Sequence, residues 1–276
     1  MDSCMPAIPS TAIIVSRNSL ESDDVSAPIQ SNISVVNALL DQWLRPDEIA
    51  ADAMCSYYVD VYEAQMDNGG FAQFVYNCNA DLAIMQQVGR GLEAMQATQH
   101  AAIYAASCAQ LEQMDDASLQ AFMDGEYFGD NPTRDALDQH DDAYYALADT
   151  EDLAVLHANW LRTHPQLVAL SIPEMQAEID RRAASIADRE ARVAAALENE
   201  PRYLKLIRHL CREGGHTLDR VTAGDPSHDY HGTHVLAWHF LTDRGHFYLL
   251  DLDGRARMYN ADSHALIAEI DAPAEA

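Results

Sequence analysis

A glycine pair interrupts a strongly helical pattern in the first half of the chain. Residues before the pair recur at helical spacing and predict one aromatic stripe facing a core: Met54, Tyr58, Val61 and Tyr62. Asn68, Gly69 and Gly70 then favour a helix end, because Asn and Gly tolerate the left-handed backbone conformation with which helices commonly stop. The apolar stripe resumes directly afterwards at Phe71, Phe74 and Val75. The sequence therefore predicts a helix that stops at the glycine pair and restarts as a second helix.

Polar side chains accompany this junction. Gln73 and Asn77 lie four residues apart on a helix face that differs from the apolar one, and Glu63 could reach their amides across the turn. A turn with a buried network of amides and a carboxylate is the ordinary structural interpretation of such a set.

The junction carries a resemblance to a known family. Its motif consists of Glu63, Asn68, Gly69, Gly70, Phe71, Gln73 and Asn77. It resembles the motif of the DNA-mimic-protein C-terminal-like family, a bacterial group of small helical domains, over roughly residues 34 to 165. The resemblance implies an acidic protein, described for one member as a dimer, that imitates duplex DNA and occupies a DNA-binding partner. It implies no chemistry for the motif residues, which are expected to be structural.

The acidic charge lies mainly in the same part of the chain. The protein has 44 Asp and Glu against 17 Lys and Arg, a formal net charge of −27. Residues 21–160 hold 25 acids and three bases, whereas residues 201–276 hold 11 acids and eight bases. Such a surface repels nucleic acid and anionic membranes and attracts basic proteins or cations. A general acidic bias, as in salt-adapted proteomes, should make both halves of the chain strongly negative. The chain has a single lysine, Lys205, which genome composition or salt adaptation would also explain.

One acidic segment is especially dense. Residues 112–152 hold 13 acids and a single base, Arg134. A helix predicted to begin at residues 131–132 places four aspartates within about 60° of arc: Asp135, Asp138, Asp142 and Asp149. Like charges at this spacing destabilise a helix by about 0.2–0.5 kcal/mol per pair. The row is either an ordinary solvated face or an imitation of DNA phosphates, which a DNA-binding surface would recognise through the summed potential.

A histidine cluster near the C-terminus offers a different function. His228, His231 and His234 are spaced by three beside Asp225 and Asp229, and imidazole and carboxylate suit zinc or nickel. The residues around them include Gly224, Pro226 and Gly232 and predict a loop, in which spacing by three does not align side chains. Polar loop histidines are therefore favoured over a metal site.

The cysteines and the N-terminal residues indicate the cellular compartment in which the protein is expected. Five scattered cysteines without Cys-x-x-Cys spacing predict reduced thiols in a cytoplasmic protein: Cys4, Cys55, Cys78, Cys108 and Cys211. The apolar run at residues 12–15 is too short for a signal peptide or a membrane span.

The chain is expected to be an α+β protein with four segments. Residues 1–31 are predicted to be a mobile lead-in with one short strand, and residues 32–170 an acidic helical domain. Residues 171–200 predict a connecting helix, and residues 201–276 a helix stopped at Gly214 and Gly215 and packed on a small antiparallel sheet.

These patterns favour a non-enzymatic acidic protein that binds a basic partner. The partner would be a DNA-binding regulator or a toxin, contacted through the four aspartates, with no cofactor, no membrane contact and no direct contact with nucleic acid. A homodimer is compatible with this interpretation. The alternatives are a metal-dependent enzyme centred on His228, His231 and His234, and a structural or assembly protein.

Overall fold

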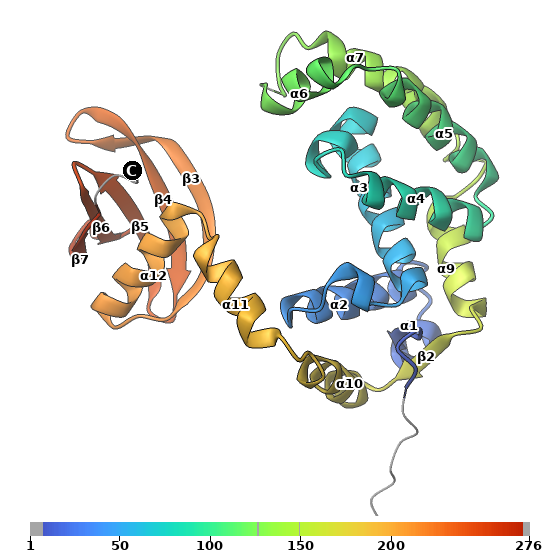
Figure 1. Ribbon diagram of the computed structural model, residues 1–276, viewed down its shortest axis with the longest axis horizontal. Coiled ribbons are helices and arrows are strands. Elements are labelled where there is room, and N and C mark those ends of the chain that lie inside the picture. Colours follow the sequence, from blue (N-terminus) through green and yellow to red (C-terminus); the bar gives the residue numbers. More distant parts are fainter. Residues whose placement is uncertain (1–7, 126, 149, 273–276) are drawn as a thin grey trace, which may run out of the picture. The chain divides into compact units, whose positions relative to one another are not determined.

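The chain forms two compact units. The computed structural model describes residues 8–125, 127–148 and 150–272, and the units comprise residues 1–187 and 188–276. Helices dominate the first unit, and a five-stranded antiparallel sheet ends the chain (Figure 1). The predicted α+β fold is therefore confirmed.

The first unit is built around the long kinked helix α3. Its elements are β1 (Ile13–Ser16), α1 (Arg17–Glu21), α2 (Ala27–Asp41), η1 (Pro46–Glu48), α3 (Ala51–Asn77), α4 (Leu82–Ala94), α5 (Thr98–Glu112), α6 (Asp116–Asp124), α7 (Pro132–Leu137), η2 (Asp138–His140), α8 (Asp141–Tyr145), α9 (Leu153–Thr163), β2 (Leu167–Leu170) and α10 (Ile172–Ala184). Helix α3 contributes to two apolar clusters. Met54 packs with α2, β1 and α9, while Tyr62, Phe71 and Phe74 pack with α4 and α5. The second cluster therefore includes α3 residues from both sides of the kink.

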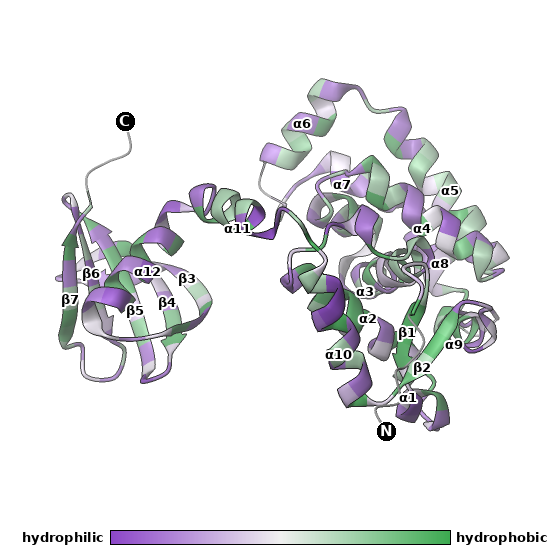
Figure 2. Ribbon diagram, turned by 60° about the horizontal axis from the view of Figure 1, so that its bottom comes forward, coloured by the Kyte–Doolittle hydropathy of each residue, from purple (hydrophilic) through white to green (hydrophobic). Residues whose placement is uncertain are grey.

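The described part of the expected mobile lead-in is instead packed structure. Strand β1 pairs in parallel with β2, with Ile13 opposite Leu167, and Ile13 and Val15 are completely buried. Apart from Ser16 at the end of β1, both strands are apolar (Figure 2), and α2 and α10 contact β1. The short apolar run at residues 12–15 thus gains its order from a strand more than 150 residues away, which no local pattern reveals.

The expected connecting helix at 171–200 is two helices rather than one. Helix α10 belongs to the first unit, where Met175 and Ile179 join the apolar cluster around β1. The second helix, α11 (Arg189–Glu198), lies in the second unit. Apolar residues keep helical spacing on both sides of the break, so the sequence pattern alone does not reveal it.

The second unit packs one helix on one face of a sheet. After α11 it contains α12 (Arg202–Gly214), β3 (Leu218–Tyr230), β4 (Thr233–Thr242), β5 (Gly245–Leu252), β6 (Arg255–Asn260) and β7 (Leu266–Asp271), the strands being ordered as in the sequence. Ile207 and Leu210 of α12 pack against Phe240, Leu249 and Met258. Gly215, in the left-handed conformation, ends α12 as the sequence predicts.

Strand β3 corrects the prediction of a loop around residues 224–232. Gly224 and Pro226 lie within the strand, and only His231 and Gly232 form the turn into β4. Pro226 falls at a register shift between Asp225 and His228, where the ladder is interrupted and the missing N–H of proline costs no strand hydrogen bond.

Within the described residues, no helix combines the length and the apolar character needed to cross a membrane.

Candidate functional site

The break in α3 lies at the glycine pair, as the sequence predicts. Gly69 and Gly70 both leave the helical conformation, and Gly70 has a φ of 83°. Helix ends free backbone N–H and C=O groups, which need other partners when water is excluded.

The freed N–H groups are capped by aspartates from a distant segment. The backbone N–H of Ala72 donates to Asp138 Oδ1 at 2.8 Å, and that of Phe71 donates to Asp141 Oδ1 at 3.2 Å. These carboxylates come from η2 and α8, 66 and 70 residues further along the chain. They also lie at the positive end of the restarted helix, where negative charge is stabilised.

The carbonyl groups on the other side of the break are bound by tyrosines of the same segment. Tyr145 donates its hydroxyl to the Met66 carbonyl at 2.7 Å, and Tyr127 donates to the Gly69 carbonyl at 3.4 Å. The segment 127–145 thus binds backbone groups on both sides of the kink, and these hydrogen bonds attach the segment to α3.

Gln65, rather than Glu63, binds the amides of the motif. Its Oε1 accepts hydrogen bonds from Gln73 Nε2 at 2.9 Å and from Asn77 Nδ2. Because the helix is kinked between these residues, side chains eight and twelve positions apart meet. The expected reach of Glu63 to the two amides is therefore wrong. Asn68, Gln73 and Asn77 instead line a shallow cavity beside Tyr127 and Phe128.

Glu63 faces a separate acidic cavity of about 250 Å³. Four carboxylates and two tyrosines contribute to its lining: Glu63, Asp67, Glu151, Asp152, Tyr144 and Tyr145. Glu151 caps the start of α5 by accepting from the N–H groups of Gln99 and His100. Burial, with Asp67 and other acids nearby, raises the pKa of Glu63 to about 7. The described residues give its carboxylate no hydrogen-bond donor, so its charge is uncompensated.

The Asp138 and Asp141 pair also resists ionisation. Burial, followed by the neighbouring Asp138 charge, raises the pKa of Asp141 to about 6. Burial raises the pKa of Asp138 as well. Negative charge is therefore crowded around Tyr144 and Tyr145, at a free-energy cost to the folded protein.

Comparison with known proteins agrees with the motif. Residues 47–164 match the family model described as DMP19-like protein. The chain carries a DMP19-like region. This is the DNA-mimic family that the motif resembles, and the predicted resemblance is confirmed. No curated protein and no solved structure matches the chain. The DMP19-like region holds 21 acids and three arginines, a formal net charge of −18 of the chain's −27.

The four predicted contact aspartates do not form one row on a helix. Helix α7 ends at Leu137, followed by η2 and α8, so the single helix expected from residue 131 is wrong. Asp138 turns inward to cap Ala72, and Asp135 pairs with Arg134 at 2.8 Å. Asp142 is exposed. Asp149 lies outside the described residues.

Many carboxylates of the acidic segment are nevertheless exposed to solvent. Exposed carboxylates of the segment 112–152 are Glu112, Asp115, Asp116, Asp124, Asp130, Asp135, Asp142 and Asp152. They are carried by α5 to α8, by the turns between these helices and, for Asp152, by the N-cap of α9. The exposed carboxylates are therefore spread over several helices and turns rather than along one helix face.

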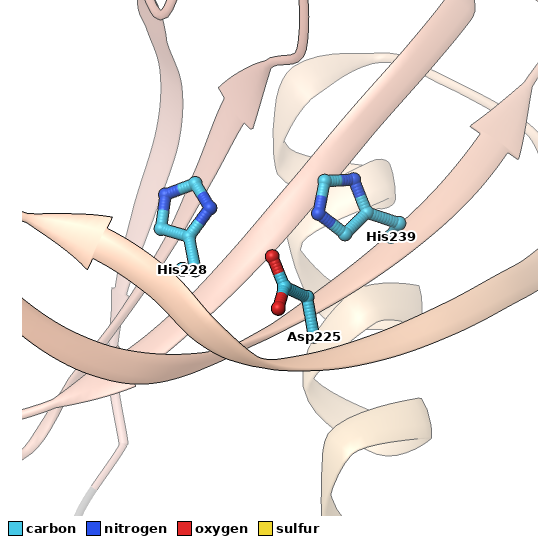
Figure 3. A group of neighbouring side chains, drawn as sticks. All are labelled: Asp225, His228 and His239. Carbon is cyan, nitrogen blue, oxygen red and sulfur yellow. The ribbon is translucent and has the colours of Figure 1, made fainter.

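The structure also rearranges the predicted histidine cluster in the second unit. His231 occupies the turn after β3, and His234 Nδ1 lies 2.8 Å from the Ser227 carbonyl oxygen. His228 instead gathers with Asp225 and His239, whose donor atoms all lie within 4.8 Å of one another (Figure 3). His239 was missed, because the pairing of β3 with β4 that brings it to His228 is hidden by an apparent loop sequence.

Proposed function

We propose that the DMP19-like region is a binding domain that occupies the DNA-binding surface of a basic protein. The observation that carries this proposal is the net charge of −18 concentrated in residues 47–164, with exposed carboxylates on α5 to α8. A cationic surface built to hold phosphates responds to such a potential, whereas nucleic acid itself is repelled. A DNA-binding regulator or a toxin is the class of partner that fits.

The crowded carboxylates around α3 and α8 support the same proposal. Glu63 has a raised pKa because its charge is half-buried and surrounded by other acids. An Arg or Lys side chain of a partner entering this cavity would supply the missing opposite charge and would release a bound proton at neutral pH. Tyr144 and Tyr145 would offer aromatic surface to the same cation.

Matched charge variants test the proposal. The test variant changes four exposed acids of the acidic segment to Asn: Asp116, Asp130, Asp135 and Asp142. The control changes four exposed acids elsewhere in the first unit to their amides: Glu21, Asp23, Asp41 and Asp180. Both variants lose the same charge and keep their side-chain size.

The assay is retention of proteins from the lysate of the source cell at low and moderate salt, identified by mass spectrometry. The parent chain and the control are expected to retain the same basic DNA-binding protein, which moderate salt releases. The test variant is expected to lose it. Equal retention by the test variant, or retention of no basic protein by the parent, would overturn the proposal.

A further inference from the structure

A β-bulge brings Asp225 and His228 to the same face of the sheet. Residues three apart in a regular strand point to opposite faces. In β3, however, Asp225 pairs with Ala237 and His228 pairs with Val235, so three residue steps on β3 match two on β4. The extra residue restores a common direction for the two side chains. Ala223 pairs with His239, which places His239 on that face as well.

This face is the one that α12 leaves uncovered. Helix α12 packs on the side of Phe240 and Leu249, whereas His239 pairs with Tyr248 on the other side. Asp225, His228 and His239 are all half-buried there, and their side chains point toward one another from two neighbouring strands (Figure 3).

We propose that Asp225, His228 and His239 form a binding site for one divalent transition-metal ion, with Zn²⁺ as the first choice. Two imidazole nitrogens and one carboxylate oxygen suit zinc and its neighbours in the first transition row, whereas Mg²⁺ and Ca²⁺ prefer oxygen ligands alone. Ligands bonded to one zinc at about 2.0–2.2 Å lie roughly 3.4 Å apart in tetrahedral geometry. Donors already within 4.8 Å reach this spacing by small side-chain rotations.

The surrounding side chains orient the donors in the way that metal ligands require. Asp225 Oδ1 accepts from the Ser227 N–H at 2.9 Å and from its hydroxyl at 3.2 Å, which leaves Oδ2 for a metal. His239 Nδ1 lies 3.3 Å from His246 Nε2, a contact that fixes the ring and presents Nε2. The His228 ring packs on Tyr248 with centroids 4.6 Å apart. Such supporting contacts set the orientation and tautomer of metal-binding side chains.

Three protein ligands leave a fourth position for water or for a small anion. This is the arrangement of zinc sites that remain open to a substrate, whereas structural zinc sites are closed by four protein ligands. The proposal concerns metal binding by the second unit and does not depend on the acidic surface of the DMP19-like region.

Calorimetric titration of the full chain tests this site. The protein is purified without a histidine tag, treated with a chelator and titrated with ZnCl₂ and, separately, with MgCl₂. One Zn²⁺ per chain is expected to bind in the strongest phase, and Mg²⁺ is expected not to bind there. Asp225→Asn and His239→Ala should each weaken that phase by at least about tenfold. His231→Ala removes a nearby turn histidine and should leave it unchanged.

Thermal unfolding gives a second readout that does not depend on heat of binding. Zn²⁺ is expected to raise the midpoint of the parent and of His231→Ala. Asp225→Asn keeps the side-chain oxygen that accepts from Ser227. In the absence of metal this variant should have the same unfolding midpoint as the parent, and Zn²⁺ should not raise it. Tight Zn²⁺ binding that survives both Asp225→Asn and His239→Ala would overturn the proposal, as would the absence of a strong 1:1 phase in the parent.

Discussion

At the scale of single residues, the junction in α3 is explained by groups that lie far away in the sequence. The motif residues show where the helix breaks, and the structure shows what holds the break. Asp138 and Asp141 bind the freed N–H groups, while Tyr127 and Tyr145 bind the freed carbonyls. No local pattern identifies these partners, because each lies about 60 to 80 residues from the group it satisfies.

The charge of Glu63 should weaken the fold near neutral pH. Its pKa is raised from 4.5 to about 7, so the folded state binds a proton that the unfolded state has already released. Protonation of Glu63 therefore adds to the free energy of unfolding in full below pH 4.5. This addition, up to about 3 kcal/mol, is lost as the pH rises through about 7. Glu63→Gln should raise the unfolding free energy at pH 8 and flatten its pH dependence between 4.5 and 7. Denaturant unfolding at several pH values measures this, and an unchanged profile would contradict the raised pKa.

Gly70 should tolerate no side chain. Its φ of 83° disfavours other residues, and an added Cβ would lie 1.9 Å from Asp141 Oδ2. Gly70→Ala is expected to cost about 1–3 kcal/mol for the backbone alone, and more because the capping carboxylate must move. Gly129→Ala is the matched control, since Gly129 has a φ of 93° but no atom within 4 Å of the added Cβ. Equal losses of unfolding free energy in the two variants would show that the carboxylate contact is unimportant.

At the scale of elements, the sequence predicts what depends on periodicity and misses what depends on tertiary pairing. The helix break at the glycine pair and the helix-plus-sheet C-terminal unit follow from apolar spacing and turn residues. The order of residues 13–16 depends on pairing with β2, and the extension of β3 through Pro226 depends on a bulge. The helix expected from residue 131 ends at Leu137, and Asp138 and Asp141, which follow it, accept hydrogen bonds from backbone N–H groups of α3.

The docking of η2 on α3 should depend on the Asp138 cap. Asp138→Ala removes the acceptor of the Ala72 N–H and should lower the unfolding free energy by about 0.5–2 kcal/mol. Asp138→Asn keeps an oxygen acceptor and should cost less. Asp142→Ala, an exposed neighbour, should stay within about 0.5 kcal/mol of the parent. If Asp138→Ala behaved like Asp142→Ala in denaturant unfolding, the capping role would be wrong.

At the scale of the whole molecule, the two units differ in charge and in candidate chemistry. Residues 1–187 carry a formal net charge of −22 and residues 188–276 one of −5. A uniform acidic bias does not produce this contrast, which fits a first unit with an electrostatic task. We propose that the units are separate domains, the first for binding a basic partner and the second for binding a metal ion.

The most direct test of the central claim is competition between this chain and duplex DNA for the retained partner. The partner is purified and titrated with the chain at rising concentrations of duplex and at several salt concentrations. The account predicts that duplex DNA and the chain exclude each other and that the affinity of the chain falls as salt rises. A ternary complex of partner, chain and duplex, or an affinity that salt leaves unchanged, would contradict it.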